Sequence, residues 1–392
     1  MKRIIPYGKQ EINADDIEAV SNVLKSDFVT QGPEIPRFEN AVSKYCGSSF
    51  AVAFNSATSA LHVACMSLGI KKGDVVWTSP ISFVASANCV LYCGGEIDFV
   101  DIDEGTNNIC ISRLKERLKE SKRNNTTPKA IIVVHLAGLS CEMQELHKLS
   151  KEYNFNIIED ASHAIGGDYK NNKIGSCQYS DISVFSFHPV KIITSGEGGM
   201  LLTNRKEIYE SSLKLRSHGI TKNPEEFINT SNAGWHYEQH FLGFNYRITD
   251  IQAVLGNSQL KRINSFISTR REISKRYFNE LDHESLNMPS LEEISTSSNH
   301  LFIVKLKDQK KENLRDKMYK HLIEKGIVTN LHYIPIYRHP YYLKFDRFDF
   351  NEFPNSESYY KCALSIPVFT SLLKKEQDRV IKEINLFLKN YK

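Results

Sequence analysis

The chain has 392 residues, of which 41% are hydrophobic and 24% are charged, and its formal net charge is +4. This composition is typical of a globular protein with room for two domains, and the small, scattered charge argues against nucleic-acid binding. No apolar stretch is long enough to span a membrane, no signal peptide is apparent, and the eight cysteines lack the spacing of a zinc site. We therefore expect a cytoplasmic protein with reduced cysteines, no metal and no membrane partner.

The first segment with a chemical signal is an apolar strand, Phe50–Phe54, which runs into Asn55-Ser56-Ala57-Thr58-Ser59. Helix-forming residues follow, so we expect a strand, a short hydroxyl-rich turn and the start of a helix. Free backbone N–H groups and the positive end of the helix dipole make such a turn an anion site. The hydroxyl side chains could instead serve only as helix caps.

Strands and helices then alternate as far as about Arg216. The helix candidates are Leu114–Lys119 and Met143–Tyr153. The strand candidates are Val75–Trp77, Ile97–Val100, Ile131–Val134, Ile157–Glu159, Ile182–Phe185 and Gly198–Thr203. This alternation predicts an α/β fold in which a mostly parallel sheet carries helices on both faces.

One of these strands ends in an acid, and the next strand is followed by a lysine. Asp160 closes one strand and is followed by His163, whereas Lys191 lies in an apolar segment after the next strand. A buried lysine amine loses proton affinity and becomes a good nucleophile, and an ionised aspartate keeps a pyridine nitrogen protonated, as pyridoxal phosphate (PLP) requires. A structural ion pair between Lys191 and Asp160 is the alternative. The anion turn, the lysine and the acid together favour a PLP site.

The pattern changes at His218, where a polar, aromatic segment extends to His240 and predicts a long loop with an active-site or interface role. Helices that begin near Thr249 and cover Arg262–Leu281 lead away from it. The remaining candidates are a strand at Phe302–Val304 and helices at Leu314–Glu324 and Gln377–Lys389, which predict a smaller α+β domain. We expect a large PLP-binding domain over 1–255 and a small C-terminal domain over 256–392.

Motifs along nearly the whole chain resemble those of the DegT/DnrJ/EryC1/StrS sugar aminotransferases, a branch of the fold-type I PLP enzymes. The closest similarity is to the branch that makes amino sugars for pseudaminic acid, a component of surface glycans. The motifs are Thr30-Gln31-Gly32-Pro33, Phe54–Leu61, Ser79–Asn88, Phe185–Lys191, Glu197-Gly198-Gly199, Arg216–Gly219, Ser298–Leu301 and His332–Tyr337.

The resemblance implies a set of cofactor contacts. Lys191 would bind PLP covalently, Asp160 would pair with the pyridine nitrogen, and His163 would lie near the phenolic oxygen. Phe83 would stack on the face of the ring. Three residues would hold the phosphate from within the same chain: Ala57, Thr58 and Ser186. These roles make Lys191, Asp160 and His163 the expected catalytic residues.

The resemblance also implies partners. Asn245 would reach the phosphate from the neighbouring subunit of a homodimer with shared active sites. Tyr7, Arg247 and His332 sit where relatives contact the nucleotide sugar. The expected reaction is transamination of the C4 ketone of a UDP-2-acetamido-2,6-dideoxy-hexos-4-ulose, a UDP-linked 4-keto-6-deoxy amino sugar, with L-glutamate as donor.

Several alternatives remain open at the level of sequence. A sister enzyme could act on a related 4-keto or 3-keto sugar of the bacillosamine, legionaminic or perosamine type. A Rossmann-type epimerase or dehydratase would fit Tyr169-x-x-x-Lys173, but no Gly-x-Gly-x-x-Gly accompanies it and its surroundings predict a hairpin turn. A PLP-binding regulator would be indicated by a lost lysine or an appended DNA-binding helix-turn-helix, and neither is apparent. Dehydratases of the same fold replace the lysine with histidine, so Lys191 argues against them.

Overall fold

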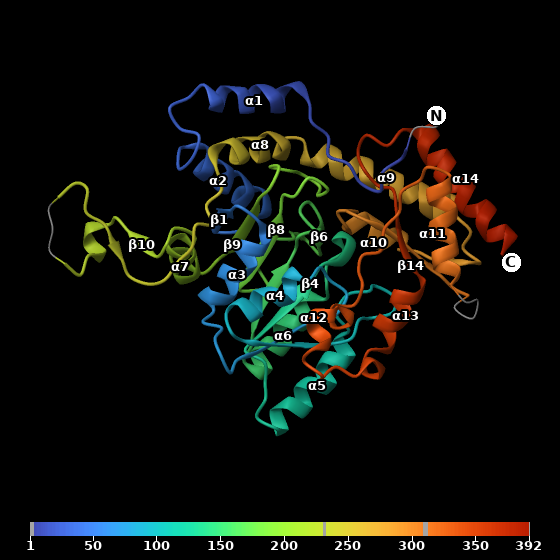
Figure 1. The fold of residues 1–392 in the computed structure, drawn as a ribbon, viewed down its shortest axis with the longest axis horizontal. Coiled ribbons are helices and arrows are strands. Elements are labelled where there is room, and N and C mark those ends of the chain that lie inside the picture. Colours follow the sequence, from blue (N-terminus) through green and yellow to red (C-terminus); the bar gives the residue numbers. More distant parts are fainter. Residues whose placement is uncertain (1–3, 230–232, 309–312, 392) are drawn as a thin grey trace.

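A seven-stranded sheet forms the centre of the protein, seen here in a computed structural model that describes residues 4–229, 233–308 and 313–391 (Figure 1). Its strand order is β1-β9-β8-β5-β4-β2-β3, and only β9 runs antiparallel to its neighbours. The other pairs are parallel, so the predicted mostly parallel sheet is confirmed. The strands are β1 (Phe50–Phe54), β2 (Val75–Thr78), β3 (Glu96–Phe99), β4 (Ala130–Val134), β5 (Asn156–Asp160), β8 (Ile182–Ser186) and β9 (Gly199–Thr203).

Helices cover both faces of this sheet because its strands are apolar on both sides. Ile132 joins a core under α3, α4 and α7, whereas its neighbour Ile131 joins another under α5 and α6. A third core lies under α2, α8 and α9. These helices are α2 (Glu34–Cys46), α3 (Ala57–Ser67), α4 (Ala85–Tyr92), α5 (Ile111–Arg123), α6 (Met143–Tyr153), α7 (Lys206–Arg216), α8 (Asp250–Leu260) and α9 (Ile263–Glu280).

A smaller antiparallel sheet lies in the C-terminal part of the chain. Its order is β12 (Leu286–Asn287), β13 (Phe302–Leu306) and β14 (Ala363–Ile366), packed against α9, α11 (Leu314–Glu324) and α14 (Lys374–Asn390). Ile5 belongs to this core and bridges to Ile327, so the N-terminal segment lies beside the C-terminal region. The domain boundary at 255/256 stays a prediction. The remaining helical elements are α1 (Ala14–Leu24), α10 (Leu291–Thr296), α12 (Pro340–Leu343), α13 (Pro354–Cys362), η1 (Leu136–Gly138), η2 (Pro224–Glu226), η3 (Ile336–Arg338) and η4 (Phe350–Glu352).

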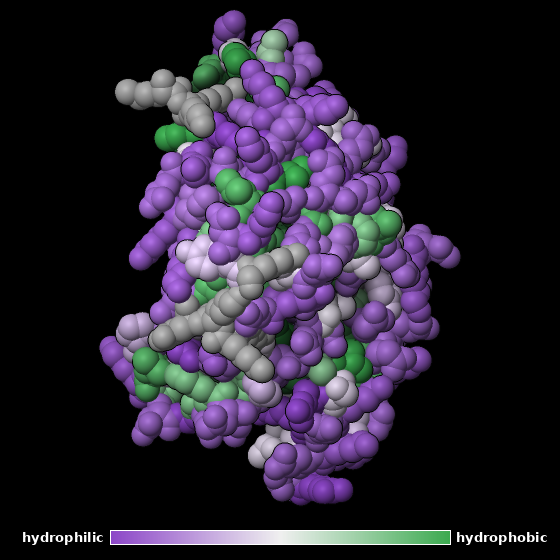
Figure 2. All heavy atoms as spheres, turned by 90° about the vertical axis from the view of Figure 1, so that its right-hand side faces the viewer, coloured by the Kyte–Doolittle hydropathy of each residue, from purple (hydrophilic) through white to green (hydrophobic). Residues whose placement is uncertain are grey.

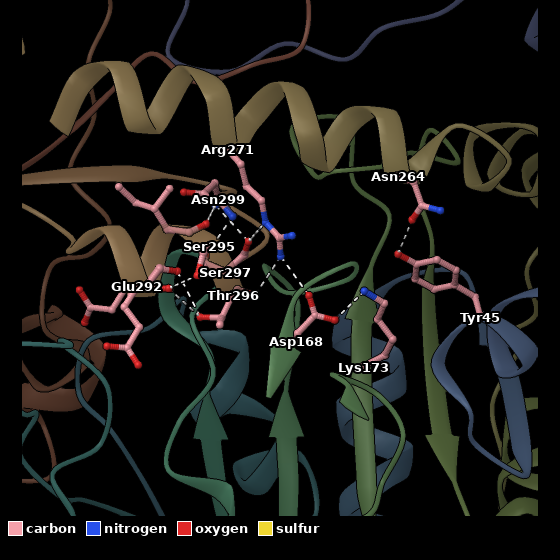
Figure 3. A network of polar contacts seen from close by, with 12 residues as sticks. Tyr45, Asp168, Lys173, Asn264, Arg271, Glu292, Ser295, Thr296, Ser297 and Asn299 are labelled. Atoms are coloured by element: carbon pink, nitrogen blue, oxygen red, sulfur yellow. Dashed lines mark hydrogen bonds and ion pairs between the residues drawn. The ribbon is translucent and has the colours of Figure 1, made fainter. Parts of the chain in front are cut away.

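A polar network ties α9 to a hairpin of the large sheet region, formed by β6 (Asp168–Tyr169) and β7 (Asn172–Lys173) (Figure 3). Asp168 accepts hydrogen bonds from Arg271 at 3.0 Å and from Lys173 at 2.6 Å. Arg271 also donates to the carbonyl of Ser297 at 3.1 Å, which fixes the turn before the Ser298–Leu301 motif. Tyr169 and Lys173, the pair of the epimerase alternative, therefore belong to a structural hairpin.

The segment predicted as a long loop forms an arm that projects from the body at the left of Figure 1. Its described part includes a two-stranded ribbon, β10 (Ile220–Thr221) and β11 (Glu238–Gln239), which the sequence did not predict. Glu238 accepts the backbone N–H groups of Ile228 and Asn229, both at 2.7 Å, and so closes the arm on itself. Large apolar side chains nevertheless face solvent, with Ile228 82% and Trp235 81% exposed.

Other surfaces are more polar. Figure 2 shows the side that carries α11 and α14, where hydrophilic residues cover most of the face and apolar ones form separate small patches. Within the described ranges no helix combines the length and apolarity needed to cross a membrane. All eight cysteines are described and none is in a disulfide.

Candidate active site

A cavity of ≈ 770 Å³ lies at the edge of the large sheet where β1, β5 and β8 end. The carboxyl ends of parallel strands are where α/β folds bind ligands, because loops and helix N-termini converge there. The cavity is lined by all but two of the eleven residues that the sequence analysis singled out: Tyr7, Ala57, Thr58, Phe83, Asp160, His163, Ser186, Lys191 and His332.

The turn after β1 has the features of an anion site. Ser56 caps α3 by accepting the N–H of Ser59 at 3.1 Å, so the first N–H groups of the helix, including those of Ala57 and Thr58, have no partner within it. Gly199 of β9 lies against this turn so closely that a Cβ there would come within 2.4 Å of the Ala57 nitrogen. The capping role and the anion site therefore coexist, and the second Gly of Glu197-Gly198-Gly199 is required by packing.

Lys191 is the only lysine among the residues that line the cavity. Desolvation lowers the pKa of its amine to about 8, and the negative charge of Asp160 opposes this only in part. In the part of the chain that the structure describes, no ion pair joins Lys191 to Asp160, so the structural ion-pair alternative is not supported. An amine with this pKa is neutral often enough near pH 8 to act as a nucleophile or a base.

Asp160 is 5% exposed and its carboxylate is held by hydroxyl groups. Ser86 Oγ donates to Oδ2 at 2.6 Å, and Ser162 Oγ donates to Oδ1 at 2.6 Å. Ser86 in turn lies 2.6 Å from Ser82 Oγ. These bonds fix the plane of the carboxylate at the floor of the cavity, which is the orientation a partner for a protonated ring nitrogen requires.

His163 lies on the loop after β5, between two segments from elsewhere in the chain. Its Nδ1 accepts the N–H of Ala137 at 3.3 Å, and its Nε2 lies 3.0 Å from the hydroxyl of Tyr333. The ring of His300 packs against it with centroids 4.4 Å apart. Desolvation, together with the positive charge of Lys191, holds the pKa of His163 well below its ordinary value.

The opposite wall comes from the N-terminal segment and from residues 330–334. The rings of Tyr7 and His332 lie 5.3 Å apart, and His332 Nδ1 lies 2.8 Å from Ser365 Oγ. Burial, with the charge of Lys191, lowers the pKa of His332 to about 3, so this wall is neutral. Phe83 is 58% exposed and its ring centroid is 6.2 Å from that of Tyr333, which leaves an aromatic face open to the cavity.

Asn245 and Arg247 do not line the cavity. Both lie at the base of the arm, where Asn245 bridges to Ser217 and Arg247 bridges to Phe54. Asn55, at the start of the anion turn, donates its N–H to the Tyr246 carbonyl at 2.9 Å. The segment therefore runs beside the turn of its own chain, and the role of Asn245 at a neighbouring subunit stays a prediction.

Other cavity residues were missed. Tyr333 and His300 lie within motifs that carry the family resemblance, but nothing in their spacing shows that they meet His163. Further polar residues of the cavity had no cofactor or substrate role assigned from the sequence: Ser56, Ser82, Ser162, His188, Glu197, Asn330 and His339.

The residues present fit PLP. The α3 N-terminus and Ser186 suit a phosphate, Lys191 is free to bind a carbonyl carbon, Asp160 suits a pyridinium nitrogen, and Phe83 offers a ring face. Each of these groups lines the same cavity, so one ligand could contact all of them.

Comparisons with known proteins agree with this geometry. The sequence model of the DegT/DnrJ/EryC1/StrS aminotransferase family matches residues 10–385. Over 368 residues the chain is 38% identical to a UDP-4-amino-4,6-dideoxy-N-acetyl-beta-L-altrosamine transaminase of Campylobacter jejuni, covering 93% of this chain and 92% of that protein.

Two solved structures superpose on nearly the whole chain. Helicobacter pylori PseC, an aminotransferase involved in the biosynthesis of pseudoaminic acid, has a TM-score of 0.89 at 30% identity and covers 99% of this chain and 100% of its own. The PLP form of Spr1654 from Streptococcus pneumoniae has a TM-score of 0.87 at 26% identity and covers 99% of both chains. The predicted fold-type I architecture is confirmed.

Proposed function

The chain belongs to the DegT/DnrJ/EryC1/StrS aminotransferase family, and on that premise we propose that it aminates the C4 ketone of a UDP-2-acetamido-2,6-dideoxy-hexos-4-ulose with L-glutamate as donor. It is a PLP-dependent sugar aminotransferase. The product would be a UDP-4-amino-4,6-dideoxy-N-acetyl sugar of the pseudaminic acid pathway. The names of the Campylobacter and Helicobacter relatives support this choice of sugar.

The observation that carries the proposal is the chemistry of the cavity wall. Arginine is the usual partner of a substrate carboxylate because it binds both oxygens, yet no arginine is among the described residues that line the cavity. Instead, Tyr7, Asn330 and His332 present neutral hydrogen-bonding groups to the cavity. Such groups suit the hydroxyl and amide groups of a sugar.

When bound, PLP supplies the carbonyl group and the electron-accepting ring through which an amino group passes from donor to acceptor. Lys191 Nζ would bind the cofactor and, once free, would take a proton from the substrate carbon and deliver it to the cofactor carbon that carried the carbonyl group. Its pKa of about 8 suits both directions of this transfer, because the protonated and neutral amine are both present near neutral pH.

We place the second subunit at the arm. Asn245 lies at its base beside the anion turn, and Ile228 and Trp235 expose apolar surface that a partner would cover. The more polar face of Figure 2 is a poorer candidate. In a homodimer of this kind, Asn245 would complete the phosphate site of the neighbouring chain. We place the enzyme in the cytoplasm, where free cysteines persist.

The proposal is tested by half-reactions. Protein converted to the pyridoxamine form is mixed with a series of UDP-, dTDP- and GDP-linked 4-keto and 3-keto sugars in the absence of glutamate. The expected result is that the PLP absorbance returns with the UDP-linked 4-keto-6-deoxy amino sugar and that NMR identifies the 4-amino product. Preference for a sister sugar would correct the substrate. Return with simple 2-oxo acids and with no nucleotide sugar would contradict a sugar substrate altogether.

A further inference from the structure

Both ring nitrogens of His163 are engaged with the protein. Nδ1 accepts a backbone N–H from Ala137, and an acceptor nitrogen carries no proton. A neutral imidazole must then carry its proton on Nε2, which lies 3.0 Å from Tyr333 Oη. His163 is therefore the donor in this bond and the Tyr333 oxygen is the acceptor. This leaves His163 without a hydrogen-bonding group for a ligand.

The neighbours of His163 hold it in this orientation. Ser298 Oγ donates to the His163 carbonyl at 2.6 Å, and the His300 ring covers one face at 4.4 Å. The Tyr333 ring lies nearly parallel to the imidazole, at an interplanar angle of 22°. Rotation of the imidazole toward the cavity would break the bonds to Ala137 and Tyr333 together.

The hydroxyl of Tyr333 still has its own proton to donate. Burial, together with the negative charge of Asp160, raises the pKa of Tyr333, so the phenol keeps its proton. The oxygens of Asp160 accept from Ser86 and Ser162 instead. Over the described ranges, Tyr333 Oη has no hydrogen bond apart from that with His163. A phenol donor without an acceptor lines the cavity.

The position of this donor suggests its acceptor. In PLP, the phenolic oxygen is bound to a carbon on the side of the ring that runs from the ring nitrogen to the carbon bearing the carbonyl group. A residue that serves this oxygen must lie near both Asp160 and Lys191. Tyr333, His163, Asp160 and Lys191 line the same cavity, and the contact between His163 and Tyr333 puts the pair beside the end of the Asp160 strand.

We propose that Tyr333 donates a hydrogen bond to the ring oxygen of PLP and that His163 is a positioning residue that holds the Tyr333 hydroxyl. His163 would then lie near that oxygen, as the resemblance implies, but act on it through Tyr333. A residue about 170 positions away in sequence thereby becomes part of the cofactor site, and it joins the C-terminal region to the sheet edge. The inference rests on the proposed binding of PLP at Lys191 and not on the identity of the sugar.

The test compares Tyr333→Phe with Tyr277→Phe, a control that removes another buried hydroxyl, bonded to the Pro367 carbonyl at 2.9 Å. Two readouts need no turnover: the affinity for PLP and the pH midpoint of the absorbance change of bound PLP. Loss of a donor to the ring oxygen should weaken PLP binding about tenfold. It should also raise the midpoint by about one pH unit, because the oxygen then better stabilises the protonated nitrogen that joins Lys191 to PLP. The control should change neither.

A double-mutant cycle tests the positioning role. If His163 acts through Tyr333, then His163→Asn in the Tyr333→Phe background should add less than about twofold to the loss of PLP affinity. Full additivity would contradict the proposal, because His163 would then contact the ligand itself. A Tyr333→Phe effect confined to the KM of the sugar would also overturn it. Borohydride reduction of the unaltered protein tests the underlying proposal, that PLP binds at Lys191, by itself. If the reduced cofactor is not attached to Lys191, the PLP site itself is wrong.

Discussion

The sheet edge and the arm differ in where their side chains find partners. At the sheet edge, Asp160 is buried and bonded to Ser86 and Ser162 of its own chain. In the arm, Glu238 accepts a backbone N–H group, but the side chains of Ile228 and Trp235 are exposed to solvent. Polar groups that react must be held before the ligand arrives, whereas exposed apolar groups gain free energy only when another surface covers them. The chemistry is therefore built within one chain, and the arm is suited to meet another.

Lys191→Ala should have the largest effect, because no second lysine is among the described residues that line the cavity. We expect the sugar half-reaction to slow by about 10³-fold or more. Single-turnover kinetics with the nucleotide sugar measure the loss, and Lys173→Ala is the control, since Lys173 pairs with Asp168 in the hairpin. Near-normal rates for Lys191→Ala would place the reactive amine elsewhere.

Asp160→Ala should come next. The anion turn, Ser186 and Lys191 are unchanged, so we expect the protein to retain PLP while turnover falls by about 10²-fold. Bound PLP is measured by absorbance after gel filtration and turnover by glutamate-dependent amination. A protein that loses PLP and activity in parallel would show that Asp160 mainly supports binding.

The arm can be tested by mixing two variant chains at a PLP concentration too low to load the Asn245 variant. Asn245→Asp would place a carboxylate where a phosphate is expected, and we predict that PLP affinity falls about tenfold. When this variant is mixed with Lys191→Ala and the subunits exchange, one site of each mixed dimer is intact, so about a quarter of the activity should return.

The matched control for subunit mixing uses two sheet-edge variants. Lys191→Ala mixed with Asp160→Ala should recover no activity, because every site then carries one defect from its own chain. Recovery of activity in this control would contradict the distinction between the two regions. So would a lack of recovery in the Asn245 mixture when the subunits do exchange.

The smallest effect concerns the charge of Lys191 in the protein without cofactor. Its folded pKa of about 8 lies below the usual 10.5, so the unfolded chain binds more protons between these values. The free energy of unfolding should therefore rise slightly as pH rises through this window, and Lys191→Ala should lack the rise. Acylation of Lys191, followed by mass spectrometry, should show a midpoint near pH 8. A midpoint near that of an exposed lysine would mean that the site is hydrated.

Much of the sheet edge was predictable because its signals are local in sequence. The strands Phe50–Phe54 and Ile182–Ser186 are apolar runs, and the residues that follow each run must emerge at the same edge of a parallel sheet. The helices α6 and α11 begin and end where their patterns predicted. The ribbon within the arm was missed because β10 and β11 have only two residues each and are separated by a long polar connection.

The sequence by itself singled out the anion turn, Asp160, His163 and Lys191, since each lies at the end of a strand or within a few residues after it. Only the tertiary structure decided which residues act together across the chain. Ser86 reaches Asp160 over 74 positions and Tyr333 reaches His163 over 170, and no periodicity encodes such contacts. They arise because α4 and the C-terminal region pack against the same sheet edge, and burial then requires each polar group to find a partner nearby.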